Sequence, residues 1–160
     1  MRLARIDHGL EIVVDDAIAR DERLGRVFGT PEDFAKDRSS TGDRCALLLN
    51  VYPAAQGAAR EAACKIILLK PTLVQSAPID VQEYARTHRS FPQETTTDQF
   101  FDQAQWESYR RLGTHITQLV FGPSSHGGHG ELLWRYLEGK SNERAVSYTH
   151  LRAHETKANL

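Results

Sequence analysis

The sequence predicts an α/β fold, in an α+β form within this stretch of chain: an antiparallel strand hairpin packed by a long helix near the C-terminal end. Three observations support this fold class. Two near-continuous apolar runs, 45–52 and 62–69, are typical of buried strands. The segment 103–121 carries apolar residues at helical spacing. Stretches rich in glycine, proline and serine separate these elements, as expected for loops.

The first 44 residues are expected to hold only short elements. The β-rich run Leu10–Val14 is predicted to be a strand, which we expect to form a hairpin with residues 3–6. Residues 25–43 contain several glycines and serines and are predicted to be a loop. Within that loop, Thr30 is expected to cap one helical turn over residues 31–36.

The two apolar runs are predicted to pair as an antiparallel hairpin around the loop 53–61. In that register Cys45 lies opposite about Leu69, and Cys64 lies opposite about Asn50. At roughly 3.3 Å per residue the cysteines are then about 17 Å apart, beyond the roughly 7 Å Cα separation that a disulfide allows. We therefore predict two free, buried thiols.

The helices have recognisable first residues. Asp80 is expected to cap a short helix over residues 81–88, which ends before a Phe-Pro pair because residues before proline avoid the α conformation. Asp102 is expected to cap the long helix 103–121, with Gln105 as the reciprocal partner of a capping box.

The long helix is predicted to turn one apolar stripe toward the core. The stripe consists of Trp106, Tyr109, Ile116 and Val120, with Leu112 and Leu119 beside it. A capped turn at residues 96–99 is expected to point Phe100 and Phe101 inward. After the long helix, a flexible glycine-rich loop over 124–130 and a last short helix over 131–137 are predicted.

The charge balance excludes several classes of partner. The chain has 20 Lys and Arg against 21 Asp and Glu, a formal net charge of −1, so no basic footprint for nucleic acid or an anionic membrane surface is present. No apolar run approaches the roughly 18 residues that indicate a transmembrane segment. The compartment stays open between the cytoplasm and a peripheral membrane location.

Histidines and one lysine are the first candidates for chemistry. His126 and His129 lie three residues apart, but no cysteine or carboxylate joins them at ligand spacing, so we favour a plain solvent loop over a metal site. His88 and His115 lie near helix ends, where surface or capping roles are expected. Lys70 ends a buried strand and is expected to reach solvent with its stem packed, with a cleft mouth as the alternative.

No serine fits the strained turn of a nucleophile elbow, Gly-x-Ser-x-Gly. Ser40 and Ser125 lack the glycine before them, and Ser124 lacks the glycine after it. The sequence also has no Gly-x-Gly-x-x-Gly, no phosphate-binding loop and no paired-cysteine zinc motif. We therefore predict no catalytic residue, no cofactor and no metal in this chain.

Three blocks nevertheless occur in a specific order. Ile66–Pro71 ends in Lys-Pro, Asp80–Ala85 begins at an aspartate cap, and Phe91–Gly113 runs from Phe-Pro to a Gln-Trp-Glu-Ser-Tyr-Arg segment. Together they resemble the C-terminal part of bacterial patatin-like phospholipases, over roughly residues 62–113. Two details depart from that family: Gln75-Ser76-Ala77 before the proline, and tryptophan at position 106 where phenylalanine is usual.

The resemblance implies a serine acyl hydrolase with a Ser–Asp dyad on a three-layer α/β scaffold. Its serine belongs to Gly-x-Ser-x-Gly and its aspartate to Asp-Gly-Gly or Asp-Gly-Ala, and neither motif occurs in this chain. Asp7-His8-Gly9 and Thr41-Gly42-Asp43 do not substitute. We therefore expect residues 1–145 to be one partial domain, inactive alone. Its partners would be the remainder of the parent chain and, through the parent, a lipid. The alternative is a small non-catalytic α+β interaction or regulatory module.

The last fifteen residues, 146–160, are expected to be a non-native tail. Val146–Thr156 resembles a transposase-type sequencing adapter translated in frame, and Asn159-Leu160 fits the bases that follow a sample index. A non-native tail is no part of the fold, so we expect neither His150 nor His154 to belong to a functional site. The sequence is then expected to be an assembly fragment of a longer gene product.

Overall fold

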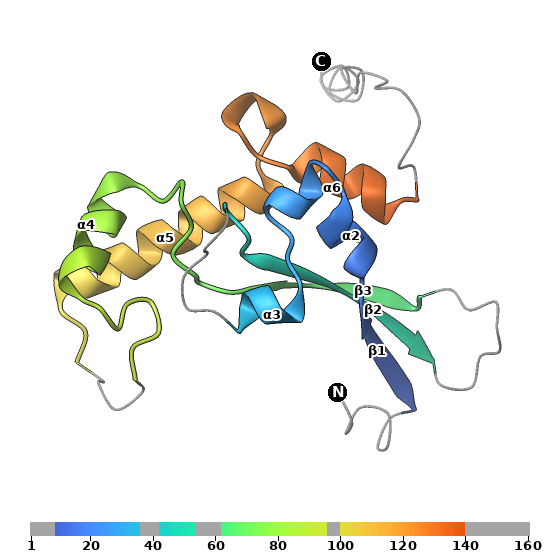
Figure 1. Cartoon of the computed structure of the whole chain (residues 1–160), viewed down its shortest axis with the longest axis horizontal. Helices are drawn as coiled ribbons and strands as arrows, with labels where there is room; N and C mark the ends of the chain where they lie inside the picture. The colour runs from blue at the N-terminus through green and yellow to red at the C-terminus, as the bar shows by residue number, and fades with distance from the viewer. Residues whose placement is uncertain (1–8, 36–41, 54–61, 96–99, 140–160) are drawn as a thin grey trace, which may run out of the picture.

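A computed structural model describes residues 9–35, 42–53, 62–95 and 100–139 (Figure 1). Its strands are β1 (Leu10–Val14), β2 (Ala46–Pro53) and β3 (Cys64–Leu69), which form one antiparallel sheet in the order β1-β2-β3. Its α-helices are α2 (Asp16–Arg20), α3 (Pro31–Phe34), α4 (Ile79–Thr87), α5 (Gln103–Phe121) and α6 (Gly130–Leu137). Two 3₁₀ turns, η1 (Leu24–Arg26) and η2 (Ser124–His126), connect them. The α+β class and the predicted hairpin are confirmed.

The hairpin register differs from the predicted one by a single residue. Ala46 pairs with Leu69, and Val51 pairs with Cys64. Both cysteines are free, as predicted, but only Cys45 is buried. Burial, and then the charge of Asp43, raises the pKa of the Cys45 thiol to about 12. The predicted burial of Cys64 is wrong because it lies on an edge strand, on a face that is partly open to solvent.

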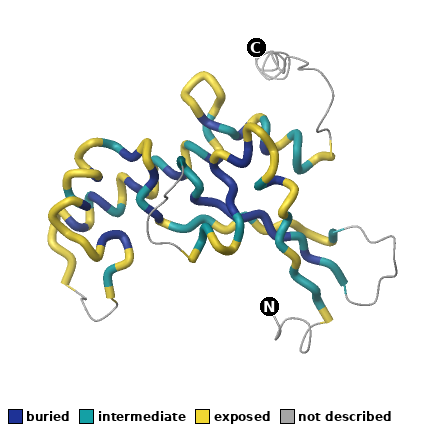
Figure 2. The backbone as a smooth tube through the Cα atoms, in the orientation of Figure 1, coloured by how far each residue is buried: buried dark blue, intermediate teal, exposed yellow. Residues whose placement is uncertain are grey.

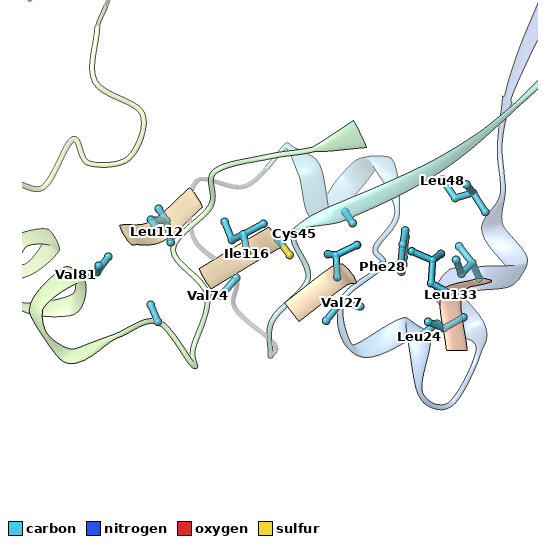
Figure 3. Close-up of a cluster of buried hydrophobic side chains, with 14 of the residues drawn as sticks. Leu24, Val27, Phe28, Cys45, Leu48, Val74, Val81, Leu112, Ile116 and Leu133 are labelled. Carbon is cyan, nitrogen blue, oxygen red and sulfur yellow. The ribbon is translucent and has the colours of Figure 1, made fainter. Parts of the chain in front are cut away.

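The central strand β2 provides the middle of the core. Figure 2 shows this buried stretch at the centre of the molecule. Leu48 lies in one apolar cluster with Ile18 of α2, Ile116 of α5 and Leu133 of α6 (Figure 3). Tight packing of such side chains is the main stabilising contribution to a domain of this size. α2, α5 and α6 therefore cover the same face of the sheet.

The opposite face of the sheet is apolar as well. Strand alternation places Leu47, Leu49 and Val51 of β2 on this face, beside Ile66 and Leu68 of β3. The three β2 residues are buried, whereas Ile66 is 41% exposed and Leu68 is 45% exposed. The prediction that both strands of the hairpin are buried is thus confirmed for β2 and wrong for β3.

Among the described helices, the short α3 is the one that lies on this second face. It contacts β2, and its Phe34 carbonyl accepts a 2.6 Å hydrogen bond from Lys70 Nζ. Thr30 caps α3 with a complete capping box in which Asp33 is the third residue of the helix, so the predicted cap is confirmed. α3 reaches only one end of the sheet, next to residue 70 (Figure 1).

The long helix α5 has the predicted bounds but a different buried stripe. Its buried residues are Gln105, Ser108, Leu112, Ile116 and Val120. Trp106, predicted to face the core, is 66% exposed. The reason is that the serine and glutamine in this stripe satisfy their polar atoms locally: Ser108 Oγ donates to the Ala104 carbonyl, and Gln105 Nε2 donates to Glu94. The spacing of apolar residues alone therefore predicted the wrong buried side for the first turns of α5.

Glycines bring α6 back against the end of α5. A Cβ atom at Gly128 would collide with the backbone of Gly122, and one at Gly130 would collide with the Phe121 carbonyl. Gly127 has a φ of 75°, a left-handed conformation that favours glycine. The segment 124–130, predicted to be a flexible loop, instead folds into η2 and the first residue of α6.

A carboxylate ties the start of the chain to its last helix. Asp15 Oδ1 accepts hydrogen bonds from the backbone N–H of Ala17, the first turn of α2, and from the hydroxyl of Tyr136 in α6. Its Oδ2 accepts a hydrogen bond from Asn50 Nδ2 on β2. Burial, followed by the hydrogen bond to Asp15, raises the pKa of Tyr136 well above its usual range.

Within the described residues, no helix is both long enough and apolar enough to cross a lipid bilayer. Several predictions fall outside those residues: the hairpin strand at 3–6, most of the loop 53–61, the turn at 96–99 and the tail 146–160.

Candidate functional site

The Phe91–Gly113 block, which carries the most specific part of the resemblance, is built around one aromatic side chain. Phe91 is buried and packs edge-on against Tyr84 of α4 and Tyr109 of α5, with ring centroids 5.1 and 4.8 Å away. Offset and edge-to-face ring pairs of this kind add to the burial of apolar area. The block therefore fixes α4 against the first half of α5.

Glu94 provides the polar anchor of the same block. Its Oε2 accepts a 2.6 Å hydrogen bond from Gln105 Nε2 and a 3.0 Å hydrogen bond from the hydroxyl of Tyr109. Burial, and then the hydrogen bond to Glu94, raises the pKa of Tyr109 to about 12. Both donors are neutral at physiological pH, and the two hydrogen bonds join Glu94 to the first turns of α5.

The cap of α5 is confirmed in one of its two halves. Asp102 Oδ1 accepts a 2.7 Å hydrogen bond from the backbone N–H of Gln105, as predicted. The reciprocal half is wrong, because the Gln105 side chain reaches Glu94 instead of the start of the helix. Asp80 does not cap α4, which begins after Pro78, but forms a 2.6 Å ion pair with Arg111 of α5.

Three aromatic side chains at the start of α5 face outward. Phe100 is 93% exposed, Phe101 is 50% exposed and Trp106 is 66% exposed. Phe101 also contacts the edge of the Tyr109 ring at 5.9 Å. The prediction that Phe100 and Phe101 point inward is wrong, because Phe91 and Tyr109 already fill the space between α4 and α5.

The structure brings together a serine, a histidine and an aspartate that sequence spacing did not connect. Ser76 Oγ lies 2.9 Å from Nε2 of His115, and the backbone N–H of Ser76 donates a 2.8 Å hydrogen bond to Asp43 Oδ1. Burial lowers the pKa of His115, while the carboxylate of Asp43 opposes part of that shift. A lowered pKa favours the neutral imidazole, and which of Ser76 Oγ and His115 Nε2 donates depends on the tautomer of the ring.

Among the described residues, the remaining parts of an acyl-transfer site do not gather around this pair. The backbone N–H of Ser76 donates to Asp43 and is therefore not available to stabilise an oxyanion. A shallow hollow of about 180 Å³ adjoins His115, and its two arginines are already paired, Arg110 with Glu107 and Arg111 with an aspartate of α4. The contact therefore links the segment 42–43, the turn at 75–76 and α5.

The histidines predicted to lie in a solvent loop do not converge on a metal site. Nδ1–H of His129 donates a 3.0 Å hydrogen bond to the Leu119 carbonyl at the end of α5. His126 is exposed, and its Nδ1 lies 3.1 Å from Ser125 Oγ. Over the described part of the chain, no group of three metal-binding side chains occurs. His88 is exposed and stacks on Tyr84, in agreement with a surface role.

His129 also lines a surface hollow of about 540 Å³ between η1, the segment at 43, η2 and α6. Arg23 and Arg26 belong to the same lining, together with Glu22 and Asp43. The lining therefore holds two positive and two negative side chains, with no excess of either charge.

Lys70 and the candidate serines are accounted for by local contacts. Lys70 is half-buried and directs its ammonium at α3, so the prediction that it reaches freely into solvent is wrong. Ser124 Oγ donates to Glu131 at 3.4 Å. Ser40 lies outside the described residues.

Comparison of the chain with models of protein families, with curated proteins and with solved structures found no match.

Proposed function

We propose that the chain is a structural portion of a patatin-like serine acyl hydrolase, whose parent protein cleaves lipid acyl esters with a Ser–Asp dyad that this sequence does not contain. The observation that carries the proposal is the sheet with two apolar faces. α2, α5 and α6 cover one face, while the other face has only the short α3 against it among the described elements. Strands that are apolar on both faces are typical of sheets between two helical layers.

The second support is the agreement between the resembling block and a structural unit. Residues 91–113 begin at the buried Phe91, include Glu94 and its two donors, and end within α5. These contacts fix the start of the block to the first half of α5, and Phe91 also packs against Tyr84 of α4. This block is thus suited to a supporting role beside a catalytic centre located elsewhere.

The rival proposal is a non-catalytic interaction module. It is favoured by the three outward aromatics, since exposed aromatic side chains are enriched at protein interfaces. In that case Phe100, Phe101 and Trp106 would contact a partner protein, and no parent hydrolase would be needed.

Genomic DNA upstream of the Met1 codon separates the two proposals. The hydrolase requires a Gly-x-Ser-x-Gly after a strand-forming run in the same reading frame. An in-frame stop codon preceded by a promoter would contradict it and favour the module.

A kinetic assay tests the same proposal on the chain as it stands. We expect the purified 160-residue protein to show no turnover of a short-chain nitrophenyl ester above the buffer rate. Turnover abolished by a serine-reactive phosphonate would contradict a purely structural role. Ser76→Ala is the matched variant, because loss of such turnover in it would assign the nucleophile to the Ser76–His115 pair.

A further inference from the structure

The directions of the backbone N–H and C=O groups of β3 follow from its pairing with β2. Lys70 N–H donates to the Cys45 carbonyl across the hairpin. Because the ladder alternates, residues 64, 66 and 68 direct their N–H and C=O groups at β2. Lys65, Ile67 and Leu69 therefore direct theirs away from the sheet. No backbone–backbone hydrogen bond from the described residues reaches these three positions.

Within the described part of the chain, this edge has little protection against pairing with another strand. Edge strands are usually guarded by prolines, bulges or exposed charges. The one charged side chain of β3, Lys65, is turned toward α6, where its Nζ donates a 2.9 Å hydrogen bond to the Leu137 carbonyl. Proline occurs only after the strand, at residue 71. The exposed side chains of β3 include Ile66 and Leu68.

We propose that β3 pairs with β3 of a second copy of this chain, antiparallel and centred on Ile67. In this register Ile67 lies opposite Ile67 of the copy and Lys65 lies opposite Leu69, so all three outward residues find hydrogen-bonding partners. If the centre of the pairing moves by one residue in either direction, one outward residue lies opposite a position outside β3 of the copy. In one of the two directions that position is Pro71. The inference concerns the isolated chain and does not depend on the proposed parent hydrolase.

The side chains fit this register. The only charged residue of the strand faces a leucine, so no like charges meet across the interface. Ile66 lies opposite Leu68 of the copy, and both are on the half-exposed face of the sheet. Pairing joins the two apolar faces into one and produces a continuous sheet in the order β1-β2-β3-β3-β2-β1.

Disulfide trapping tests the register directly. Residues 66 and 68 of opposite copies form a non-hydrogen-bonded pair with Cα atoms about 4.5 Å apart, within disulfide range. We would prepare Ile66→Cys and Leu68→Cys separately in a Cys64→Ser background, which removes the exposed native thiol. A covalent dimer is expected only when the two variants are mixed. Equal cross-linking in each variant alone, or none in the mixture, would overturn the proposal.

Self-association in solution provides the second test. The weight-average mass of the wild-type chain, measured by analytical ultracentrifugation over a dilution series, should rise toward that of two copies. Ile67→Pro removes an outward N–H without removing a hydrogen bond to β2, so it should stay monomeric. Because Ile67 also packs against the core, an unchanged circular dichroism spectrum is required to show that the variant is folded. Ile12→Pro is the matched control, since Ile12 occupies the equivalent outward position on β1. A wild-type chain that stays monomeric, or association lost only in Ile12→Pro, would refute the β3 interface.

Discussion

Glu94 and Asp15 each hold a tyrosine hydroxyl and a side-chain amide, yet they organise the molecule on different scales. Glu94 binds Gln105 and Tyr109, which follow it by 11 and 15 residues. Asp15 binds Asn50 and Tyr136, which follow it by 35 and 121 residues. The first carboxylate stabilises one block between two helices. The second joins the strand β1, the centre of the sheet and the last helix.

The two carboxylates should therefore differ in how strongly each one affects stability. Loss of Glu94 disturbs contacts that the neighbouring Phe91 packing still keeps close together. Loss of Asp15 removes a contact between segments with a large loop-closure cost, and it uncaps α2 as well. We therefore expect unequal responses to equivalent substitutions.

The largest expected effect follows from Asp15→Ala. The change removes a helix cap and leaves the Tyr136 hydroxyl and the Asn50 amide without their acceptor, which together should lower the free energy of unfolding by about 3 kcal/mol. Urea denaturation followed by circular dichroism measures it. The exposed neighbour Asp16→Ala serves as the control and should change stability by less than about 0.5 kcal/mol.

Glu94→Gln should have a smaller effect, about 1 kcal/mol, because the amide keeps one acceptor oxygen for Gln105 or Tyr109. The same denaturation experiment applies, with Glu107→Gln, at a surface ion pair of α5, as the matched variant. A loss from Glu94→Gln as large as that from Asp15→Ala would abolish the proposed distinction between the two clusters.

Alkaline pH should weaken the stabilisation provided by both the Glu94–Tyr109 and the Asp15–Tyr136 contacts. The folded pKa of Tyr109 is about 12 and that of Tyr136 is also raised, whereas a tyrosine in the unfolded chain has a pKa of about 10. The unfolded chain therefore loses these protons first, and stability present below pH 10 should decline as the pH rises toward 12. Tyr109→Phe and Tyr136→Phe should each flatten that decline. A slope unchanged in both variants would contradict the assignment.

The smallest expected effect concerns the surface contact between Ser76 and His115. Since burial lowers the folded pKa of His115, stability should be full above the unfolded value near 6.5 and should fall as the pH decreases through the range between the two values. His115→Gln should remove this acid-side slope, and Ser76→Ala should cost less than about 0.5 kcal/mol at pH 7. Unfolding curves at several pH values measure both. A steeper acid-side slope in His115→Gln would show that the folded pKa of His115 is raised and not lowered.

Local patterns predicted the elements whose determinants lie within a few residues. The bounds of α5, the Thr30 capping box, the Asp102 cap and the β2–β3 hairpin all depend on such neighbours. The predictions failed where a distant element decides the outcome. Cys64 is exposed because β3 lies at a sheet edge, which no feature of its own segment reveals.

The contacts among Asp43, Ser76 and His115 could not be predicted from the sequence. Asp43, Ser76 and His115 are separated by 33 and 39 residues and meet only because α5 packs beside the turn at 75–76. Their residue types are a recognisable signal, but spacing along the chain does not connect them. Trp106 illustrates the opposite error, in which an apolar residue at helical spacing suggested burial although the polar Gln105 occupies the inner position.

The close approach of Gly122, Gly128 and Gly130 has a consequence for sequence variation. At all three positions a methyl group would meet backbone atoms, which cannot move aside as a flexible side chain can. In a library that samples every substitution, alanine is commonly among the best-accepted replacements, yet it should be depleted at these sites. The corner between α5 and α6 would then appear as three intolerant glycine positions, of which Gly128 and Gly130 are buried.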